Sequence, residues 1–137
     1  MTDSPALIVD ASAVVAQLTT PGERGKWFAA QMLGKQLFSS EMLHYEVTNI
    51  LRRGRRQGAL DETAANLAFQ DLQDMAIRLE PFSLVANRIW KLRDSVTAYD
   101  ASYVAVAEWR RAPLLTADLR LTRSHGPKCE FITPPMS

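Results

Sequence analysis

The sequence has very little cysteine, with Cys129 alone among its 137 residues. A single cysteine excludes an internal disulfide framework and a cysteine-rich zinc site, and it fits a reducing compartment. The chain also lacks the ~18 consecutive apolar residues that span a bilayer. Its first residues carry neither the basic nor the apolar segment of a secretory signal. We therefore expect a cytoplasmic protein with no membrane segment.

Neither sign of charge dominates, because 16 Lys and Arg stand against 15 Asp and Glu, for a formal net charge of +1. This balance excludes the strongly basic profile of a protein that coats nucleic acid by bulk electrostatics. It does not exclude an enzyme that acts on nucleic acid, since a total hides any local separation of charge. The length and the 47% hydrophobic content predict one folded domain over residues 1–137.

Short apolar runs alternate with helical patterns along the chain. An unbroken apolar run such as Ala6–Val9 suits a strand that is buried on both faces of a parallel sheet. Ser40 and Asp61 are expected to cap two of the helices. The expected strands are 6–9, 36–39, 77–79, 113–116 and 130–132, and the expected helices are 12–18, 23–32, 41–57, a segment after Asp61, 84–93, 97–107 and 118–123. The alternation predicts an α/β fold with a mainly parallel five-stranded sheet.

Two aspartates directly follow predicted strands. Asp10 comes after the first strand and Asp118 after the fourth. In open α/β sheets, ligands bind at the carboxyl ends of strands, near the point where the strand order reverses. Aspartate is also a favoured helix N-cap, and capping is the ordinary explanation for each residue taken singly.

Two further acids lie on predicted helices. Asp100 ends the capping-box pattern Thr97-Ala98-Tyr99-Asp100, yet it shares a helix face with the apolar residue Val104 and is therefore directed inward. Glu46 precedes the core position Val47 and flanks the apolar stripe of its helix. A solvated helix edge is the ordinary alternative for Glu46, and a partly buried cap is the alternative for Asp100.

The four acids are more informative together than separately. Carboxylates packed in one pocket repel each other, and such a cluster is stable mainly when cations hold it together. Oxygen ligands without cysteine or histidine suit Mg²⁺ or Mn²⁺ better than Zn²⁺. Such an ion can activate water and stabilise the charge that develops on a phosphodiester. The acids thus indicate metal-dependent phosphodiester chemistry.

Four segments of the chain resemble the successive signatures of a known family. They are Val9-Asp10-Ala11-Ser12, Glu46-Val47-Thr48-Asn49-Ile50-Leu51, Thr97-Ala98-Tyr99-Asp100-Ala101-Ser102-Tyr103 and Leu115-Thr116-Ala117-Asp118. In this order and over nearly the whole chain, they resemble the PIN domain, and within it the VapC branch of the VapBC toxin–antitoxin systems.

The resemblance implies an α/β/α sandwich with strand order 3-2-1-4-5 and the activity of an endoribonuclease toxin that inhibits growth by cleaving RNA. It implies a catalytic, metal-binding set in which Mg²⁺ or Mn²⁺ is held directly or through water. The set is Asp10, Glu46, Asp100 and Asp118. Ser12 and Thr116 match hydroxyl positions that support this set, although local capping explains them equally well. The implied partners are RNA, a second copy of the chain and a cognate VapB-type antitoxin.

Positive charge gathers at the end of the helix that bears Glu46, in Arg52-Arg53-Gly54-Arg55-Arg56. Helical spacing places Glu46, Asn49, Arg53 and Arg56 on one face, so these residues are candidates to bind the RNA backbone. A solvated basic helix end is the alternative. A second basic rim is expected from Arg110, Arg111, Arg120 and Arg123.

Several other functions remain to be weighed against a toxin nuclease. A haloacid-dehalogenase phosphatase needs a second aspartate two residues after the first, where this chain has Ser12, and a receiver domain needs paired acids at a strand end. Two alternatives stay open. One is a PIN-type nuclease that acts on other nucleic acid, and the other is a non-catalytic module that binds RNA or protein.

Overall fold

The computed structural model describes residues 4–135 as one parallel sheet with helices on both sides. The strands are β1 (Ala6–Val9), β2 (Gln36–Ser40), β3 (Ile77–Glu80), β4 (Leu114–Leu115) and β5 (Phe131–Ile132). They are ordered β3-β2-β1-β4-β5, and every neighbouring pair is parallel. The predicted α/β class and strand order are confirmed.

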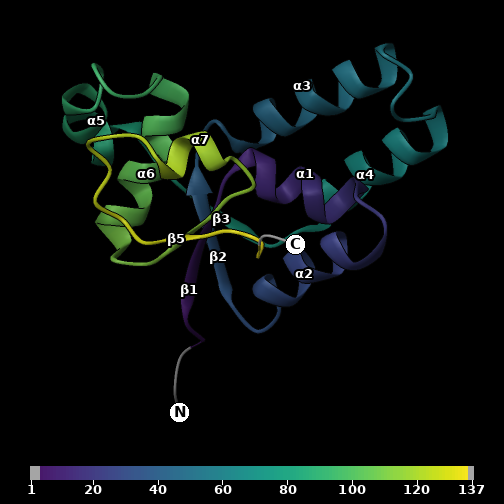
Figure 1. Cartoon of the computed structure of the whole chain (residues 1–137), viewed down its shortest axis with the longest axis horizontal. Helices are drawn as coiled ribbons and strands as arrows, with labels where there is room; N and C mark the ends of the chain where they lie inside the picture. Colours follow the sequence, from purple (N-terminus) through teal and green to yellow (C-terminus); the bar gives the residue numbers. More distant parts are fainter. Residues whose placement is uncertain (1–3, 136–137) are drawn as a thin grey trace.

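The helices flank the sheet in two groups (Figure 1). They are α1 (Ala11–Thr19), α2 (Gly22–Met32), α3 (Leu43–Arg56), α4 (Glu62–Asp74), α5 (Phe82–Lys91), α6 (Ala98–Arg110) and α7 (Leu119–Thr122). Helices α5 and α6 lie on one side of the strands, and α1, α2 and α4 lie on the other (Figure 1). None of the helices in the described part of the chain is long and apolar enough to cross a membrane.

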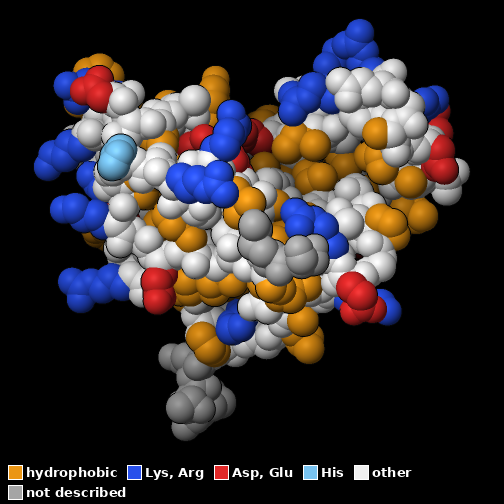
Figure 2. Space-filling model, viewed as in Figure 1, with side chains coloured by type: hydrophobic (Ala, Val, Ile, Leu, Met, Phe, Trp, Pro, Cys, Tyr) orange, Lys and Arg blue, Asp and Glu red, His pale blue; other side chains and the backbone are white. Residues whose placement is uncertain are grey.

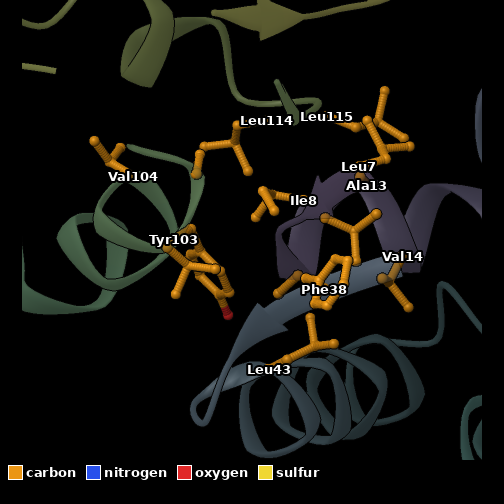
Figure 3. Close-up of a cluster of buried hydrophobic side chains, with 14 of the residues drawn as sticks. Leu7, Ile8, Ala13, Val14, Phe38, Leu43, Tyr103, Val104, Leu114 and Leu115 are labelled. Carbon is orange, nitrogen blue, oxygen red and sulfur yellow. The ribbon is translucent and has the colours of Figure 1, made fainter. Parts of the chain in front are cut away.

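The core forms where β1 and α6 meet. Leu7, Ile8 and Val9 are at most 1% exposed, which explains why this strand is apolar at every position. The seven residues of α6 from Ala101 to Ala107 are all buried, and most are small enough to let the helix approach the sheet closely. Figure 3 shows Tyr103 of this helix reaching into the apolar cluster beside Ile8 and Phe38.

The strand order brings the ends of β1 and β4 together. Because β2 and β3 extend to one side of β1, and β4 and β5 to the other, the order reverses between β1 and β4. Val9 pairs with Leu115, and the amide of Asp10 donates to the carbonyl of Leu115 at 3.3 Å. The residues that follow these two strands therefore lie side by side at the carboxyl edge of the sheet.

Two helix starts differ from the sequence-based prediction. Ser40 is the last residue of β2 and does not cap α3, which begins at Leu43 without a side-chain cap. Helix α5 begins at Phe82, two residues earlier than predicted, because the carboxylate of Glu41 accepts a hydrogen bond from the Phe82 amide at 2.5 Å. Glu41 lies 41 residues away in the sequence, so the residues around Phe82 do not predict this hydrogen bond.

Arg110 was predicted to line a basic rim, and the structure corrects this. Its guanidinium donates to Oε1 of the buried Glu80 at 2.5 Å and 3.1 Å, and it lies 3.8 Å from the ring centre of Phe38. Removing the arginine would leave the Glu80 charge buried and unpaired. Arg110 therefore stabilises the join between β3 and α6.

Candidate active site

The Asp10 carboxylate is held by three donors at the carboxyl edge of the sheet. Ser12 Oγ donates to Oδ1 at 2.7 Å, the amide of Ala13 donates to the same oxygen at 2.9 Å, and Thr116 Oγ1 donates to Oδ2 at 2.5 Å. Asp10 is only 4% exposed. Its side chain caps α1 and also accepts a hydrogen bond from Thr116, after the neighbouring strand β4. One side chain can therefore serve both as a helix cap and as part of the site.

The hydroxyls of Ser12 and Thr116 join the ends of β1 and β4. Ser12 Oγ accepts from the amide of Ala117 at 2.8 Å, and Thr116 Oγ1 accepts from the amide of Asp118 at 3.0 Å. Each hydroxyl thus accepts a hydrogen bond from a backbone amide of the loop after β4 and donates a hydrogen bond to Asp10. This pattern fixes the position of Asp10 relative to the segment that carries Asp118.

Asp118 is the N-cap of α7. Its Oδ1 accepts from the amide of Arg120 at 3.0 Å and lies 3.6 Å from Arg120 Nε. Together with Asp100 and Arg93, these two residues line a polar pocket of about 470 Å³. Figure 2 shows acidic side chains gathered in a notch between the α7 side and α3, with Lys and Arg side chains nearby.

Asp100 lies in the first turn of α6, where Thr97 supplies the cap by accepting from the Asp100 amide at 3.2 Å. The carboxylate of Asp100 is half-buried and faces other acids. Burial is the main cause of its raised pKa, and the charges of Asp118 and Glu46 raise that pKa further. The electrostatic field of Asp100 acts in turn on Asp10. The fold therefore brings Asp100 close enough to each of the other three predicted acids for their charges to interact.

Tyr103 lies in the segment Thr97–Tyr103 that resembles the PIN domain, but the sequence predicted no role for it. Its hydroxyl donates to Glu46 Oε1 at 2.5 Å, across 57 residues of chain. Burial first, and then the hydrogen bond and charge of Glu46, raise the pKa of Tyr103 well above its usual range, with further contributions from Asp10 and Asp100. The spacing of three residues from Asp100 on one helix is the signal that could have found it.

A larger groove adjoins the acids on the other side of Glu46. It has a volume of about 810 Å³ and runs between α3 and α4, with Tyr99 of α6 at one end. Glu46, Asn49 and Arg52 line it together, whereas Arg53 and Arg56 are exposed further along α3. The structure thus places Asn49 beside Glu46 and makes Arg52 the arginine of α3 that lines this groove.

The pKa of Asp10 predicts how the metal-free protein responds to pH. Burial outweighs the three hydrogen bonds and raises this pKa from 3.8 to about 6. Between these values the folded protein binds a proton that the unfolded chain releases, so stability falls as pH rises through this window. In a chelator, we expect the free energy of unfolding to be about 1 kcal/mol higher at pH 5 than at pH 7.

The measurement is thermal or urea unfolding at several pH values in the presence of a chelator. Asp10→Asn is the matched variant, because asparagine keeps the cap but cannot ionise. Its unfolding should depend less on pH over this range, with Asp100 supplying the remainder. Equal pH dependence in the two proteins would contradict a raised pKa at Asp10.

The donor set of the site fits a hard divalent cation, since it consists of carboxylate oxygens supported by hydroxyls. Within residues 4–135, no three acidic, imidazole or thiol side chains already converge into a finished ligand set. Three of the acids are bound to protein donors: Asp10 to Ser12, Ala13 and Thr116, Glu46 to Tyr103, and Asp118 to the Arg120 amide.

Comparison with known proteins agrees with this geometry. The PIN domain family model matches residues 7–125. VapC ribonuclease Mb0985 of Mycobacterium bovis is 33% identical over 129 residues, which cover 94% of this chain and 98% of that protein. Two solved structures share the fold. One is PAE2754 from Pyrobaculum aerophilum, with a TM-score of 0.69, 24% identity, and coverage of 94% of this chain and 90% of that one.

The other is VapBC2 from Rickettsia felis bound to a DNA fragment from its promoter. It has a TM-score of 0.66 and 12% identity, and the match covers 93% of this chain and 98% of that one. The family model spans most of the chain, and the Mycobacterium bovis relative matches it almost end to end. The chain therefore belongs to the PIN-domain family and, within it, to the VapC ribonucleases.

Proposed function

We propose that this protein is an endoribonuclease that requires Mg²⁺ or Mn²⁺ and acts as the toxin of a type II toxin–antitoxin system. The observation that supports the proposal is that Asp100 lies close enough to Asp10, Glu46 and Asp118, near the reversal point of the sheet, for their charges to interact. The fold does not require carboxylates to lie close together at this edge of the sheet, and the repulsion between their charges lowers the stability of the folded protein. A site that retains this cost is expected to serve a cation.

The four carboxylates would hold the cation directly or through water. When bound, it supplies a Lewis acid that activates water and stabilises charge on the phosphodiester. The residues of the chain do the remaining work. Ser12 and Thr116 keep Asp10 in one orientation, and the buried setting of Asp10 limits its movement.

RNA would reach the acids along the two hollows that flank them. Arg52 in the groove, and Arg53 and Arg56 further along α3, can contact successive phosphates, while Arg93 and Arg120 can do so in the polar pocket. Contacts of this kind give affinity without sequence preference. The salt dependence of RNA binding tests them, since each phosphate contact on a single strand contributes a slope of about −0.7 in log K against log salt.

The proposed partners are a VapB-type antitoxin and a second copy of the chain. VapBC2 of Rickettsia felis, which shares the fold, carries the names of both VapB and VapC. Large apolar side chains are exposed on α5 and α6, with Phe82 61%, Trp90 67% and Trp109 56% exposed, and such a surface suits contact with another chain. Light scattering of the purified chain, alone and with its antitoxin, measures both associations.

The direct test of the function is incubation of the purified protein with total cellular RNA in Mg²⁺. We expect internal cleavage of the RNA and growth arrest when the chain is expressed without an antitoxin. A DNA-directed PIN nuclease would cleave DNA of the same sequence at least as fast. A binding module would retain RNA on a filter without cutting it, and that outcome would contradict the proposal.

A further inference from the structure

A buried tyrosine contacts the acid site from inside the core. Tyr103 is 2% exposed, and its ring packs among apolar side chains of the sheet (Figure 3). Its hydroxyl donates to Glu46. The bond joins the middle of α6 to the first turn of α3. These two helices bring Asp100 and Glu46 to the site, so the hydroxyl connects the elements that carry two of the four acids.

Glu46 needs such a partner because its own helix does not fix it. Its side chain has three rotatable bonds and stands beside the open groove, where a glutamate gains conformational freedom by turning into water. A phenol donor at 2.5 Å restrains one carboxylate oxygen, Oε1. A restrained carboxylate loses less freedom when a cation binds.

The tyrosine hydroxyl suits this task better than a charged donor would. It has a single proton, which it donates to Glu46 Oε1. A lysine or arginine here would neutralise Glu46 and compete with a cation, whereas a neutral hydroxyl leaves the negative charge intact. The rigid ring, packed in the cluster that holds Phe38 and Ile8, restricts the positions that the donor can take.

We propose that Tyr103 is a positioning residue that holds Glu46 in the orientation required by the divalent cation. This role rests on the proposed function, since it takes Glu46 to serve the cation directly or through water. Tyr103 touches neither the cation nor RNA and acts through Glu46 alone. Its hydroxyl, rather than its ring, carries the role.

The test is Tyr103→Phe, which removes the hydroxyl and keeps the ring. We expect the affinity for Mn²⁺, measured by calorimetry without RNA, to fall by about tenfold or more, as for other partners that orient a metal ligand. The Mg²⁺ concentration that half-saturates cleavage should rise by a similar factor. The cleavage rate at saturating Mg²⁺ should change less, because excess metal selects the correct orientation of Glu46.

Two variants control for the loss of a hydroxyl. Tyr45→Phe makes the same change at a tyrosine that is 77% exposed and adjacent to Glu46 in sequence. Ser102→Ala removes a buried hydroxyl of α6 that bonds to Ser40 Oγ at 2.8 Å. Both variants should bind Mn²⁺ with the affinity of the unmodified chain. If the loss of any buried hydroxyl of α6 weakened Mn²⁺ binding, Ser102→Ala would weaken it too.

Glu46→Gln separates this inference from the proposed function. If Glu46→Gln weakens Mn²⁺ binding and Tyr103→Phe does not, the positioning role is overturned and the metal site stands. If Glu46→Gln leaves Mn²⁺ binding unchanged, the role of Glu46 is overturned, and that of Tyr103 with it. Adding Tyr103→Phe to Glu46→Gln should cause little further loss of Mn²⁺ affinity, and an additive loss would also overturn the proposal.

Discussion

Replacing Asp100 with asparagine is expected to reduce RNA cleavage at least about a hundredfold, the upper end of the effect of losing an outer partner of a metal site. Asparagine has the same shape but lacks the charge that a divalent cation requires. The fold should not suffer, because Thr97 caps α6 through the backbone amide of residue 100. Asp100 has a raised pKa, so its ionised form is disfavoured in the folded state. The metal-free variant should therefore melt at the same or a higher temperature.

Opposite changes in activity and stability distinguish this prediction from ordinary damage. Asp74→Asn makes the same chemical change at an exposed position at the end of α4, and it should leave both cleavage and melting unchanged. Cleavage and melting are measured on the same preparations. An Asp100→Asn protein that cleaves RNA normally, or that loses cleavage only because it unfolds, would contradict the account.

Removing divalent cations is expected to stop cleavage completely and to lower stability at neutral pH. Without a cation, the charges of Asp118 and Glu46 act on Asp100, that of Asp100 acts on Asp10, and burial already disfavours the charge on Asp10. Adding Mg²⁺ or Mn²⁺ should restore cleavage. A cation at ten times its dissociation constant stabilises the fold by about 1.4 kcal/mol, provided that it binds the folded state alone.

The Asp100→Asn variant provides the control for this experiment. Its melting temperature should respond less to Mg²⁺ than that of the unmodified chain, because the ligand set is incomplete. Cleavage that continues in excess chelator would rule out a carboxylate-bound cation as part of the reaction. Stabilisation by Mg²⁺ that is equal in both proteins would place the cation elsewhere on the molecule.

The fold could be predicted from the sequence because its strongest signals are local. The apolar run Ala6–Val9 must be buried on both faces, and alternation with helical segments leaves a parallel sheet as the simplest arrangement. The helix boundaries that were wrong depend on distant partners. Helix α5 starts at Phe82 because Glu41 accepts its amide, and Ser40 ends a strand whose neighbour is β1.

The positions of the acids were predictable for a related reason. Asp10 and Asp118 were ambiguous between capping a helix and joining a site, and in the structure both cap helices. Asp10 also accepts from Thr116 after β4, and Asp118 lines a pocket with Asp100. The two interpretations do not compete, because the helix start and the ligand crevice occupy the same edge of the sheet. The sequence pattern therefore located these residues although it could not separate their roles.

The contacts among side chains could not be predicted in the same way. The bond from Tyr103 to Glu46 depends on how α3 and α6 lie across the sheet, which helical spacing within either segment does not specify. Arg110 was assigned to a basic rim on charge alone, yet it pairs with the buried Glu80 and packs over Phe38. Charge and periodicity identify the chemistry that a residue can perform, while its partners decide whether it performs it.

The most direct test of the central claim is anomalous diffraction from crystals of the protein soaked in Mn²⁺. The claim is that carboxylates from four separated segments form one cation site at the carboxyl edge of the sheet. We predict an anomalous peak bounded by the carboxylates of Asp10, Asp100 and Asp118, with Glu46 adjacent. A Mn²⁺ peak bound only by other groups, or a site that stays empty at Mn²⁺ concentrations that support RNA cleavage, would contradict the claim.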